Sequence, residues 1–301
     1  MAGRLAIIGG SQGYRTVAGL SEVGCINPFK TPFGYCPPIH KLQVDDQEIF
    51  FLSRHGETGY TVSAPFVNYR ANIWALKELG VSKIVAWSGP GAIDTSIAIG
   101  EILVPGDLID ETDGRKTTFY EGLGIGFIRQ NPVFCPHLAH NLTDIIKRKY
   151  GHCRTEDVYV CTQGPRLETP AEIRKYAMFG ATLVGMTLVP EAFLAKELEM
   201  CYCPICYVTN YAEGVVERKY KEGELFEGLL ADGEKTAVEN AVKVLPSLAI
   251  EALLADKKTD CNCGVSMKRY RLRGDIDDDW HSWINKPGKS RCPEGESHLR
   301  D

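Results

Sequence analysis

Three hydroxyl side chains and an arginine each follow a segment that the residue pattern predicts to be a strand. Ser11 lies in a glycine-rich turn, Ser88 precedes another glycine, and Thr187 stands just before a predicted helix. Arg54 adds a planar guanidinium and His55 an imidazole. Ligands of open α/β sheets bind at the carboxyl ends of the strands, where such donors and exposed backbone amides can surround a phosphate group. The combination predicts a phosphate site, although each residue alone more often has a structural role.

An acid, a hydroxyl and a carboxamide mark a second set of predicted turns, between Gly164 and Asn210. Glu168 belongs to the Gly-Pro-Arg-Leu-Glu-Thr segment that begins at Gly164, and Thr187 belongs to the segment 185–191. Asn210 follows the last predicted strand. A carboxylate accepts hydrogen bonds, whereas a carboxamide both donates and accepts them. These groups suit a purine and a ribose held beside an anion.

The elements that must position these residues alternate between strand and helix. Apolar runs predict strands at 5–8, 48–52, 83–87, 107–110, 157–161, 182–185 and 203–208. Helical periodicity or helix-start signals predict helices at 67–79, 138–150, 171–178, 190–198 and 234–254. This alternation over residues 1–255 favours an α/β/α layered fold.

The bulk composition excludes several classes of protein. The chain has 301 residues, a formal net charge of −5, 44% hydrophobic and 24% charged residues, which are ordinary values for a globular protein. The charge offers no basic surface for nucleic acid. The apolar run at 5–8 is too short for a signal peptide or a membrane span, and no later run is long enough. We expect a cytoplasmic protein without a nucleic-acid or membrane partner.

The order and spelling of these motifs resemble the trimeric purine nucleoside phosphorylase and methylthioadenosine phosphorylase family. The matching segments are 7–11, 54–56, 67–76, 164–168, 185–191 and 209–210. The stretch 68–78 and the Met-Thr-x-Val-Pro-Glu motif at 186–191 are the most specific. The resemblance spans about residues 4–255. It implies a three-layer α/β/α fold with a central mixed, partly barrel-like sheet of the nucleoside phosphorylase type.

Members of this family are pentosyltransferases of purine salvage, in which phosphate attacks C1′ of a purine nucleoside and releases the free base and ribose 1-phosphate. The resemblance implies a phosphate site made by Ser11, Arg54, His55, Ser88, Gly89 and Thr187. It implies a nucleoside site made by Met186 under the ribose, by Leu167, Glu168, Asn210, Tyr211 and Ala212 at the base, and by Tyr60 in place of a histidine that faces ribose or phosphate. Asn210 and His55 are the implied catalytic residues. Phosphate is a co-substrate, and no cofactor or metal is expected.

The preferred base follows from Glu168 and Asn210. A carboxamide can accept from N7–H and donate to O6 of hypoxanthine or guanine, and a carboxylate can accept from their N1–H. Methylthioadenosine phosphorylases usually carry Asp-Tyr-Asp where this chain has Asn210-Tyr211-Ala212, and a small residue where it has Glu168. Both differences favour inosine, guanosine or 5′-methylthioinosine as the substrate. The residues that would contact the 5′ substituent lie near 221–225.

Other readings of the same residues stay open. A methylthioadenosine phosphorylase is the nearest alternative. The segment 88–91 departs from the family's usual residues, as does Tyr60, and these departures motivate a non-catalytic nucleoside- or phosphate-binding protein. A nicotinamide-dependent oxidoreductase is disfavoured because the turn 10–13 lacks the G-x-G-x-x-G spacing.

The eleven cysteines suit buried thiols better than a disulfide framework. Cys201, Cys203 and Cys206 could bind a soft metal, but alternate strand residues point to opposite faces and no second cluster lies nearby in the sequence. We interpret them as core thiols. Cys261 and Cys263 are too close together for ordinary chelation, which leaves a strained disulfide or two exposed thiols. The resemblance adds that a similar pair forms a disulfide in some thermophilic members.

The predicted domain organisation is a nucleoside phosphorylase domain over 1–256 and a polar extension over 257–301 that contains the Cys-x-Cys pair. Trp280 and Trp283 in the extension either drape over the surface or pack on a neighbouring subunit. Family members commonly form trimers in which a neighbour's residues reach across near the segment 134–137. A homotrimer or a dimer of trimers is therefore expected.

Overall fold

The computed structural model describes residues 3–10, 17, 21–28, 30–219, 222–255 and 261–284. Ser11 and residue 221 in the segment assigned to the 5′ substituent lie outside these residues, as do Cys292 and the rest of the chain beyond 284.

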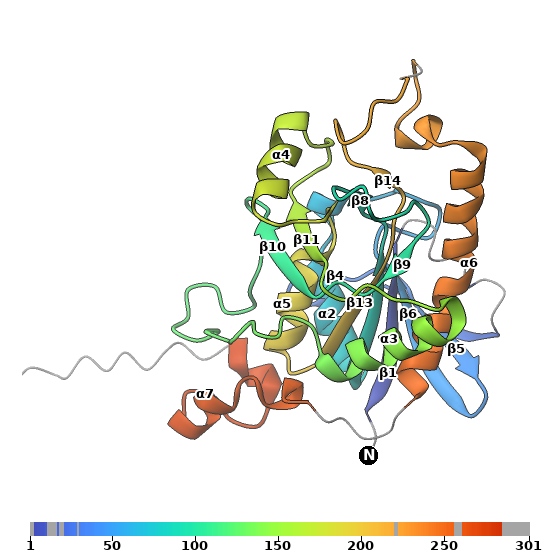
Figure 1. Cartoon of the computed structure of the whole chain (residues 1–301). Helices are drawn as coiled ribbons and strands as arrows, with labels where there is room; N and C mark the ends of the chain where they lie inside the picture. The colour runs from blue at the N-terminus through green and yellow to red at the C-terminus, as the bar shows by residue number, and fades with distance from the viewer. Residues whose placement is uncertain are drawn as a thin grey trace, which may run out of the picture.

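A seven-stranded sheet forms the centre of the molecule, in the order β2-β5-β6-β1-β7-β13-β9 (Figure 1). Its strands are β2 Glu22–Ile26, β5 Ile39–Val44, β6 Gln47–Ser53, β1 Arg4–Gly9, β7 Val81–Ser88, β13 Cys201–Tyr207 and β9 Ile102–Leu103. The four strands from β6 to β13 are parallel and almost wholly buried, whereas β2, β5 and β9 pair in antiparallel fashion at the two edges. Parallel strands covered on both faces consist of continuous apolar runs, which is why the sequence pattern found these four.

A second, five-stranded sheet continues from the first in the order β10-β11-β12-β8-β14. Its strands are β10 Asp107–Glu111, β11 Val158–Thr162, β12 Leu183–Gly185, β8 Gly91–Ala92 and β14 Asn210–Tyr211. β7 leads through Gly89-Pro90 into β8, and β13 leads through Val208-Thr209 into β14. The chain thus passes directly from a strand of the first sheet into a strand of the second sheet at two places. The predicted α/β fold with a central mixed sheet is confirmed.

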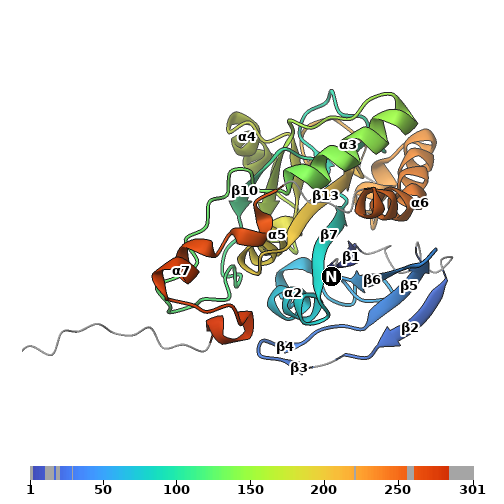
Figure 2. The same cartoon turned by 90° about the horizontal axis from the view of Figure 1, so that it is seen from below.

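Helices cover both faces of the central strands. α3 (Pro136–Tyr150) packs on α6 (Asp232–Leu254) and on β13, whereas α2 (Tyr69–Glu78) packs on α5 (Leu188–Glu197). Figure 2 shows the two helix pairs on opposite sides of β7 and β13. α4 (Pro170–Met178) covers the second sheet, where Ile173 and Tyr176 join a smaller apolar cluster. Shorter elements before residue 255 are β3 Lys30–Thr31, β4 Gly34–Tyr35 and the 3-10 helices η1 Ala64–Phe66 and η2 Phe226–Leu229.

Local signals account for the start of α4. The Thr169 hydroxyl accepts from the Glu172 N–H at 3.2 Å, the Glu172 carboxylate accepts from the Thr169 N–H at 2.7 Å, and Pro170 occupies the first turn. This capping box satisfies donors that the helix itself leaves unpaired. The helix predicted at 171–178 is confirmed, and it begins one residue earlier, at Pro170.

The helix α2 differs from its predicted amphipathic pattern. The helical periodicity of 67–79 predicts that Asn72 lies away from the apolar face formed by Ile73 and Leu76, but Asn72 is only 2% exposed. That prediction was wrong because α2 lies between the sheet and α5 and is therefore buried on nearly every side. The strands β2 and β5 were also missed, since their mixed polar sequence gives no strong pattern without the partner strand.

Residues 261–284 pack on the chain's own core through η3 (Cys263–Val265), α7 (Lys268–Arg273) and η4 (Trp280–Ile284), drawn in red in Figure 1. The Trp280 ring lies 4.5 Å from the Trp74 ring, and Trp283 is 2% exposed. The Arg271 guanidinium pairs with Glu199 at 2.7 Å. Both tryptophans therefore have partners within the chain.

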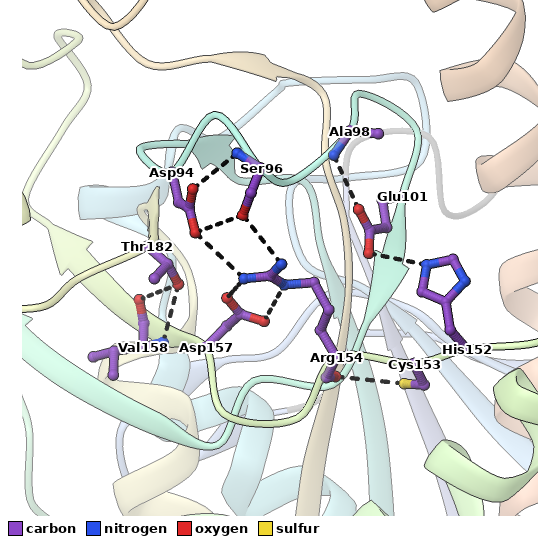
Figure 3. A network of polar contacts seen from close by, with 10 residues as sticks. All are labelled: Asp94, Ser96, Ala98, Glu101, His152, Cys153, Arg154, Asp157, Val158 and Thr182. Carbon is purple, nitrogen blue, oxygen red and sulfur yellow. Dashed lines mark hydrogen bonds and ion pairs between the residues drawn. The ribbon is translucent and has the colours of Figure 1, made fainter.

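A polar network ties the loop after β8 to the start of β11 (Figure 3). The Arg154 guanidinium donates to both Asp157 carboxylate oxygens, at 2.8 and 2.9 Å, and also contacts Asp94 and Ser96. Because Arg154 joins the segment before β11 to Asp94 and Ser96, it fixes the loop that follows β8. None of the helices in the described part of the chain has both the length and the apolar character that a bilayer crossing requires.

Candidate active site

The predicted hydroxyl groups meet where β7 ends and α5 begins. The Ser88 Oγ lies 3.0 Å from the Thr187 Oγ1 and 3.0 Å from the buried Tyr159 hydroxyl. Thr187 is the N-cap of α5, but in the described structure its side chain makes no capping hydrogen bond. The hydroxyl is directed to Ser88 instead, and the helical backbone of α5 is interrupted at Val189 (φ −103°, ψ 133°), so the continuous helix begins after that residue.

Gly89 lies directly after Ser88, where close neighbours leave no room for a side chain. A Cβ added at this position would lie 2.8 Å from the Thr209 Cγ2 and 2.9 Å from the Tyr207 Cζ. The Thr209 N–H donates to the Pro90 carbonyl at 3.0 Å. Glycine therefore lets the ends of β7 and β13 approach one another, and it leaves backbone exposed beside Ser88.

Arg54 has a strong partner that the sequence analysis did not assign. Its Nε and Nη2 donate to Glu191 at 2.8 and 2.7 Å, and its Nη1 donates to the Trp87 carbonyl at 3.3 Å. The Tyr202 hydroxyl donates to the same carboxylate at 2.7 Å. Burial by itself lowers the pKa of Arg54, but the adjacent Glu191 raises it above the ordinary value. The guanidinium is therefore fixed in place and always charged.

His55 is buried beside Arg54 and is held as the neutral ring. Its Nδ1 donates to the Val62 carbonyl at 2.9 Å, and its ring centroid lies 4.7 Å from that of Tyr60. Burial and the Arg54 charge lower the pKa of His55 to about 4. The Nε2 atom is therefore a hydrogen-bond acceptor near neutral pH, suited to a hydroxyl group. Tyr60 itself is 71% exposed.

The lowered pKa of His55 predicts a loss of stability in acid. Between pH of about 4 and 6.5 the unfolded chain binds the proton that the folded chain refuses, so stability rises with pH in this window and is complete above it. Across this window the lowered pKa of His55 changes the free energy of unfolding by about 3 kcal/mol. We expect His55→Asn to flatten the pH dependence of the unfolding free energy, measured by urea titration at each pH.

Two features make this comparison specific to His55. Glu197, whose pKa burial raises to about 7, titrates in both proteins and cancels in their difference. His140 is exposed on α3, and His140→Asn serves as the matched control that keeps the slope. An unchanged slope in His55→Asn would contradict the neutral, buried state assigned to His55.

Glu168 lies on the second sheet's side of the site, in the loop between β11 and α4. It is 9% exposed, and one of its carboxylate oxygens accepts a 2.5 Å hydrogen bond from the Thr162 hydroxyl. That contact fixes the carboxylate and leaves its other oxygen as an acceptor. The adjacent Leu167 is half-buried.

Asn210 begins β14 and pairs with Gly91 of β8. Its Oδ1 accepts from the Thr209 hydroxyl at 2.7 Å, and its Nδ2 donates to the Tyr211 carbonyl at 2.8 Å. These neighbours fix the orientation of the amide, because a flipped amide would bring the Asn210 Oδ1 against the Tyr211 carbonyl oxygen, and both atoms are acceptors. One N–H and one lone pair remain for a ligand.

The two residues after Asn210, Tyr211 and Ala212, have mainly structural contacts. The Ala212 N–H donates to the Ala92 carbonyl at 2.8 Å, and Ala212 is 6% exposed. Tyr211 is half-buried and lies 5.5 Å from the Arg218 guanidinium, measured to the ring centroid.

Met186 lies against the loop that leads to Glu168. Gly164 has a φ of +66°, and a Cβ there would lie 2.5 Å from the Met186 Sδ. Glycine is required at this position both by the backbone conformation and by the close approach of the thioether. Two of the segments that match the family, 164–168 and 185–191, are therefore in contact.

Arg115 organises this half of the site and was not found from the sequence. Its Nη1 donates to the Met186 carbonyl at 2.7 Å and also to the Val189 carbonyl, and its Nη2 donates to the carbonyls of Thr162 and Gln163 at 3.0 and 2.7 Å. One guanidinium thus joins the ends of β11 and β12 to the start of α5. It lies in a loop without periodic pattern, so only the tertiary structure indicates its role.

A cavity of about 440 Å³ meets the site at Arg54. Its walls come mainly from the loop after β6 and from the start of α2, and they include Glu57, Asn68 and Asn72. The Asn72 Oδ1 is buried and has no hydrogen-bond partner among the described residues. Such an atom is an acceptor for a ligand that enters the cavity. The family match at 68–78 was the sequence signal that could have identified Asn72 as a site residue, but the helical pattern predicted that Asn72 lies away from the apolar face.

Comparison with known proteins gives consistent matches. Residues 4–248 match the phosphorylase superfamily. The chain is 38% identical over 275 residues to a probable S-methyl-5′-thioinosine phosphorylase from Methanothermobacter thermautotrophicus, which covers 90% of this chain and 89% of that protein. It is 36% identical over 272 residues to a 6-oxopurine nucleoside phosphorylase from Pyrococcus furiosus, which covers 88% of this chain and 98% of that protein.

Solved structures give the same result for the fold. A methylthioadenosine phosphorylase sourced from an Antarctic soil metagenomic library has a TM-score of 0.75 and 26% sequence identity, and the match covers 89% of this chain and 92% of that one.

Proposed function

The chain belongs to the phosphorylase superfamily, and on that premise we propose that it is a pentosyltransferase that cleaves 6-oxopurine nucleosides with inorganic phosphate. Inosine, guanosine and 5′-methylthioinosine are its proposed substrates. The products are the free base and the corresponding ribose 1-phosphate, which is a step of purine salvage.

The observation that carries this proposal is the fixed amide of Asn210. Thr209 and Tyr211 each use one side of it, which leaves one acceptor and one donor. Those two groups match N7–H and O6 of a departing 6-oxopurine. The free oxygen of Glu168 accepts from N1–H, a proton that adenine lacks. The Asn210 N–H that donates to O6 stabilises the negative charge that develops on the base as the C1′–N9 bond breaks.

The phosphate is the nucleophile in this proposal. As the bond from C1′ to N9 breaks, positive charge grows on the sugar, and a phosphate oxygen forms the new bond to C1′. We assign phosphate binding to Ser88, Gly89 and Thr187, with the charge of Arg54 behind them. Ser11, outside the described residues, completes the set by its position after β1.

His55 and Met186 are assigned to the sugar. A neutral His55 with an acceptor at Nε2 suits a ribose hydroxyl or the protonated oxygen of a phosphate, and Tyr60 covers this ring from the solvent side. The thioether of Met186 provides an apolar surface for the ribose. Leu167, Tyr211 and Ala212 are assigned to the surroundings of the base.

The remaining features of the proposal concern the whole protein. We assign catalysis to residues 1–256, with 257–301 as an extension whose described residues, 261–284, pack on this domain. Catalysis uses phosphate as a co-substrate and no cofactor. A cytoplasmic homotrimer, or a dimer of trimers, is the proposed form, with the segment 134–137 near a subunit interface.

A phosphate-dependent substrate panel tests the proposal. The purified chain is incubated with inosine, guanosine, 5′-methylthioinosine, adenosine or 5′-methylthioadenosine, with and without phosphate, and the free base is quantified by chromatography. We expect phosphate-dependent release of hypoxanthine or guanine. Faster release of adenine would indicate a methylthioadenosine phosphorylase instead, and hypoxanthine binding without any phosphorolysis would indicate a non-catalytic nucleoside-binding protein.

A further inference from the structure

Four cysteines from distant parts of the chain lie together outside the proposed active site. The sulfur atoms of Cys135, Cys201, Cys261 and Cys263 all lie within 4.8 Å of one another. Cys135, Cys201 and Cys263 are buried, and Cys261 is half-buried. All four are free thiols, and the sulfur atoms of Cys201 and Cys261 are 3.5 Å apart.

This spacing matches a tetrahedral metal site. Zinc binds thiolate sulfur at about 2.3 Å, so four ligands at the corners of a tetrahedron lie about 3.8 Å apart. Each of the four cysteines contributes one sulfur ligand, so the protein fills all four positions of the site. Such a closed set is typical of a structural zinc site, because a catalytic zinc site keeps one position open for water or substrate.

The backbone holds these cysteines in place from three separate elements. Cys135 is the N-cap of α3, and its N–H donates to the Tyr202 carbonyl at 2.8 Å. Cys201 is the first residue of β13. Cys263 begins η3, at the start of the C-terminal segment. The ligands therefore come from an ordered framework.

The surroundings supply positive charge for a thiolate complex. A zinc ion with four thiolates carries a net charge of −2. Lys196 lies close enough to Cys135 and Cys263 for its ammonium to interact with both electrostatically. The N-terminus of α3, which follows Cys135, also favours negative charge.

We propose that Cys135, Cys201, Cys261 and Cys263 bind one structural zinc ion as a tetrathiolate. Binding replaces each S–H bond with a Zn–S bond, so four thiols release four protons to solvent and no oxidation occurs. The ion joins the C-terminal segment 261–284 to the starts of α3 and β13, next to the ion pair of Arg271 with Glu199.

This site revises two interpretations of the cysteines. Cys203 and Cys206 are buried in the core, as expected, but Cys201 faces cysteines distant in the sequence. Cys261 and Cys263 are neither disulfide-bonded nor both exposed in the structure. The second cluster needed to complete four ligands was absent nearby in the sequence but is supplied by the fold.

Metal content and thiol state test the proposal directly. The full chain, without a histidine tag, is produced in zinc-supplemented medium and purified under reducing conditions without chelator. Elemental analysis is expected to give about one zinc ion per chain, released when a mercurial reagent blocks the thiols. Zinc content below about one tenth per chain would overturn the proposal. So would an alkylation and mass analysis that finds these four cysteines linked as two disulfides.

Variants locate the site. Cys201→Ser is expected to reduce the zinc content at least about tenfold. Cys153→Ser is the control, because Cys153 is a partly buried free thiol that lies outside the cluster, and this variant should retain the full zinc content. Equal zinc content in both variants would place the metal elsewhere and refute the assignment.

A cobalt titration keeps the proposal testable if Cys201→Ser does not fold. Metal-free wild-type protein is titrated with Co²⁺ under anaerobic conditions. We expect thiolate-to-cobalt charge-transfer absorption and intense ligand-field bands of tetrahedral cobalt, which saturate at about one equivalent and disappear when zinc is added. Absence of these bands in folded, reduced protein would refute the site. These readouts do not depend on enzymatic activity.

Discussion

Replacing Asn210 with aspartate is expected to lower kcat/KM for inosine by roughly 100- to 1,000-fold. The substitution removes the N–H that donates to O6 and sets a carboxylate oxygen against that atom. The same oxygen faces the Tyr211 carbonyl, which now accepts from the Asn210 amide at 2.8 Å. Two oxygen acceptors cannot share a hydrogen bond unless one is protonated, so both the base contact and the fixed orientation are lost.

The same substitution should shift the base preference toward 6-aminopurines. A carboxylate at position 210 can accept from the exocyclic amine of a 6-aminopurine, so the ratio of kcat/KM for adenosine or 5′-methylthioadenosine to that for inosine should rise. Initial rates with each nucleoside at saturating phosphate measure this ratio. Asn240→Asp, which makes the same change on the exposed face of α6, is the matched control and should keep the wild-type ratio.

Glu168 provides an independent arm of the same test. Glu168→Gln keeps the size of the side chain and removes the charge that accepts from N1–H. We expect a lower kcat/KM for inosine and little change for adenosine. If both variants kept the wild-type substrate ratio, Asn210 and Glu168 would not be the base-contacting pair.

Replacing Glu191 with glutamine is expected to destabilise the fold by about 3–5 kcal/mol. Glu191 and Arg54 are both 0% exposed at the side chain, and their bidentate pair is the anchor of the guanidinium. Removal of one charge leaves the other buried without compensation, because water cannot enter to solvate it. Thermal and urea unfolding measure the change.

An exposed carboxylate provides the control for Glu191. Glu251 pairs with Arg148 and Lys149 on the surface, where its side chain is 38% exposed, and Glu251→Gln should cost at most about 1 kcal/mol. Equal losses in Glu191→Gln and Glu251→Gln would contradict the importance of the buried pair.

A double variant separates stability from function if Glu191→Gln fails to fold. Arg54→Met combined with Glu191→Leu replaces the pair with apolar side chains of similar size, and such replacements often restore stability. We expect a folded protein with a strongly raised KM for phosphate, since the proposed site has lost its permanent positive charge. Full phosphate affinity in the double variant would remove Arg54 from the phosphate site.

The sequence predicted those parts of the fold whose cause is local. The apolar runs of β1, β6, β7 and β13 mark strands because each is covered on both faces. The capping box of Thr169 and Glu172 marks the start of α4 because its hydrogen bonds span only three residues. The edge strands β2 and β5 lacked such a signal, since their partners are supplied only by the folded sheet.

The chemistry of the site was predictable to the same extent. The side-chain types of Ser88, Thr187, Glu168 and Asn210 indicated an anion and a purine, and the contact between Ser88 and Thr187 bears out their predicted proximity. Their roles in binding and catalysis stay predictions that the substrate panel and the variants can test.

The sequence by itself therefore determined the layered α/β architecture and the chemical character of the strand ends, because hydrophobic periodicity and helix capping act between residues a few positions apart. Only the tertiary structure decided that Glu191 anchors Arg54 across 137 residues, that Arg115 joins three segments, and that four cysteines converge on one point. Burial supplies the physical reason. A charge, a donor or a thiol that leaves water must find a partner in space, and which residue provides it is set by the packing of the sheets and helices.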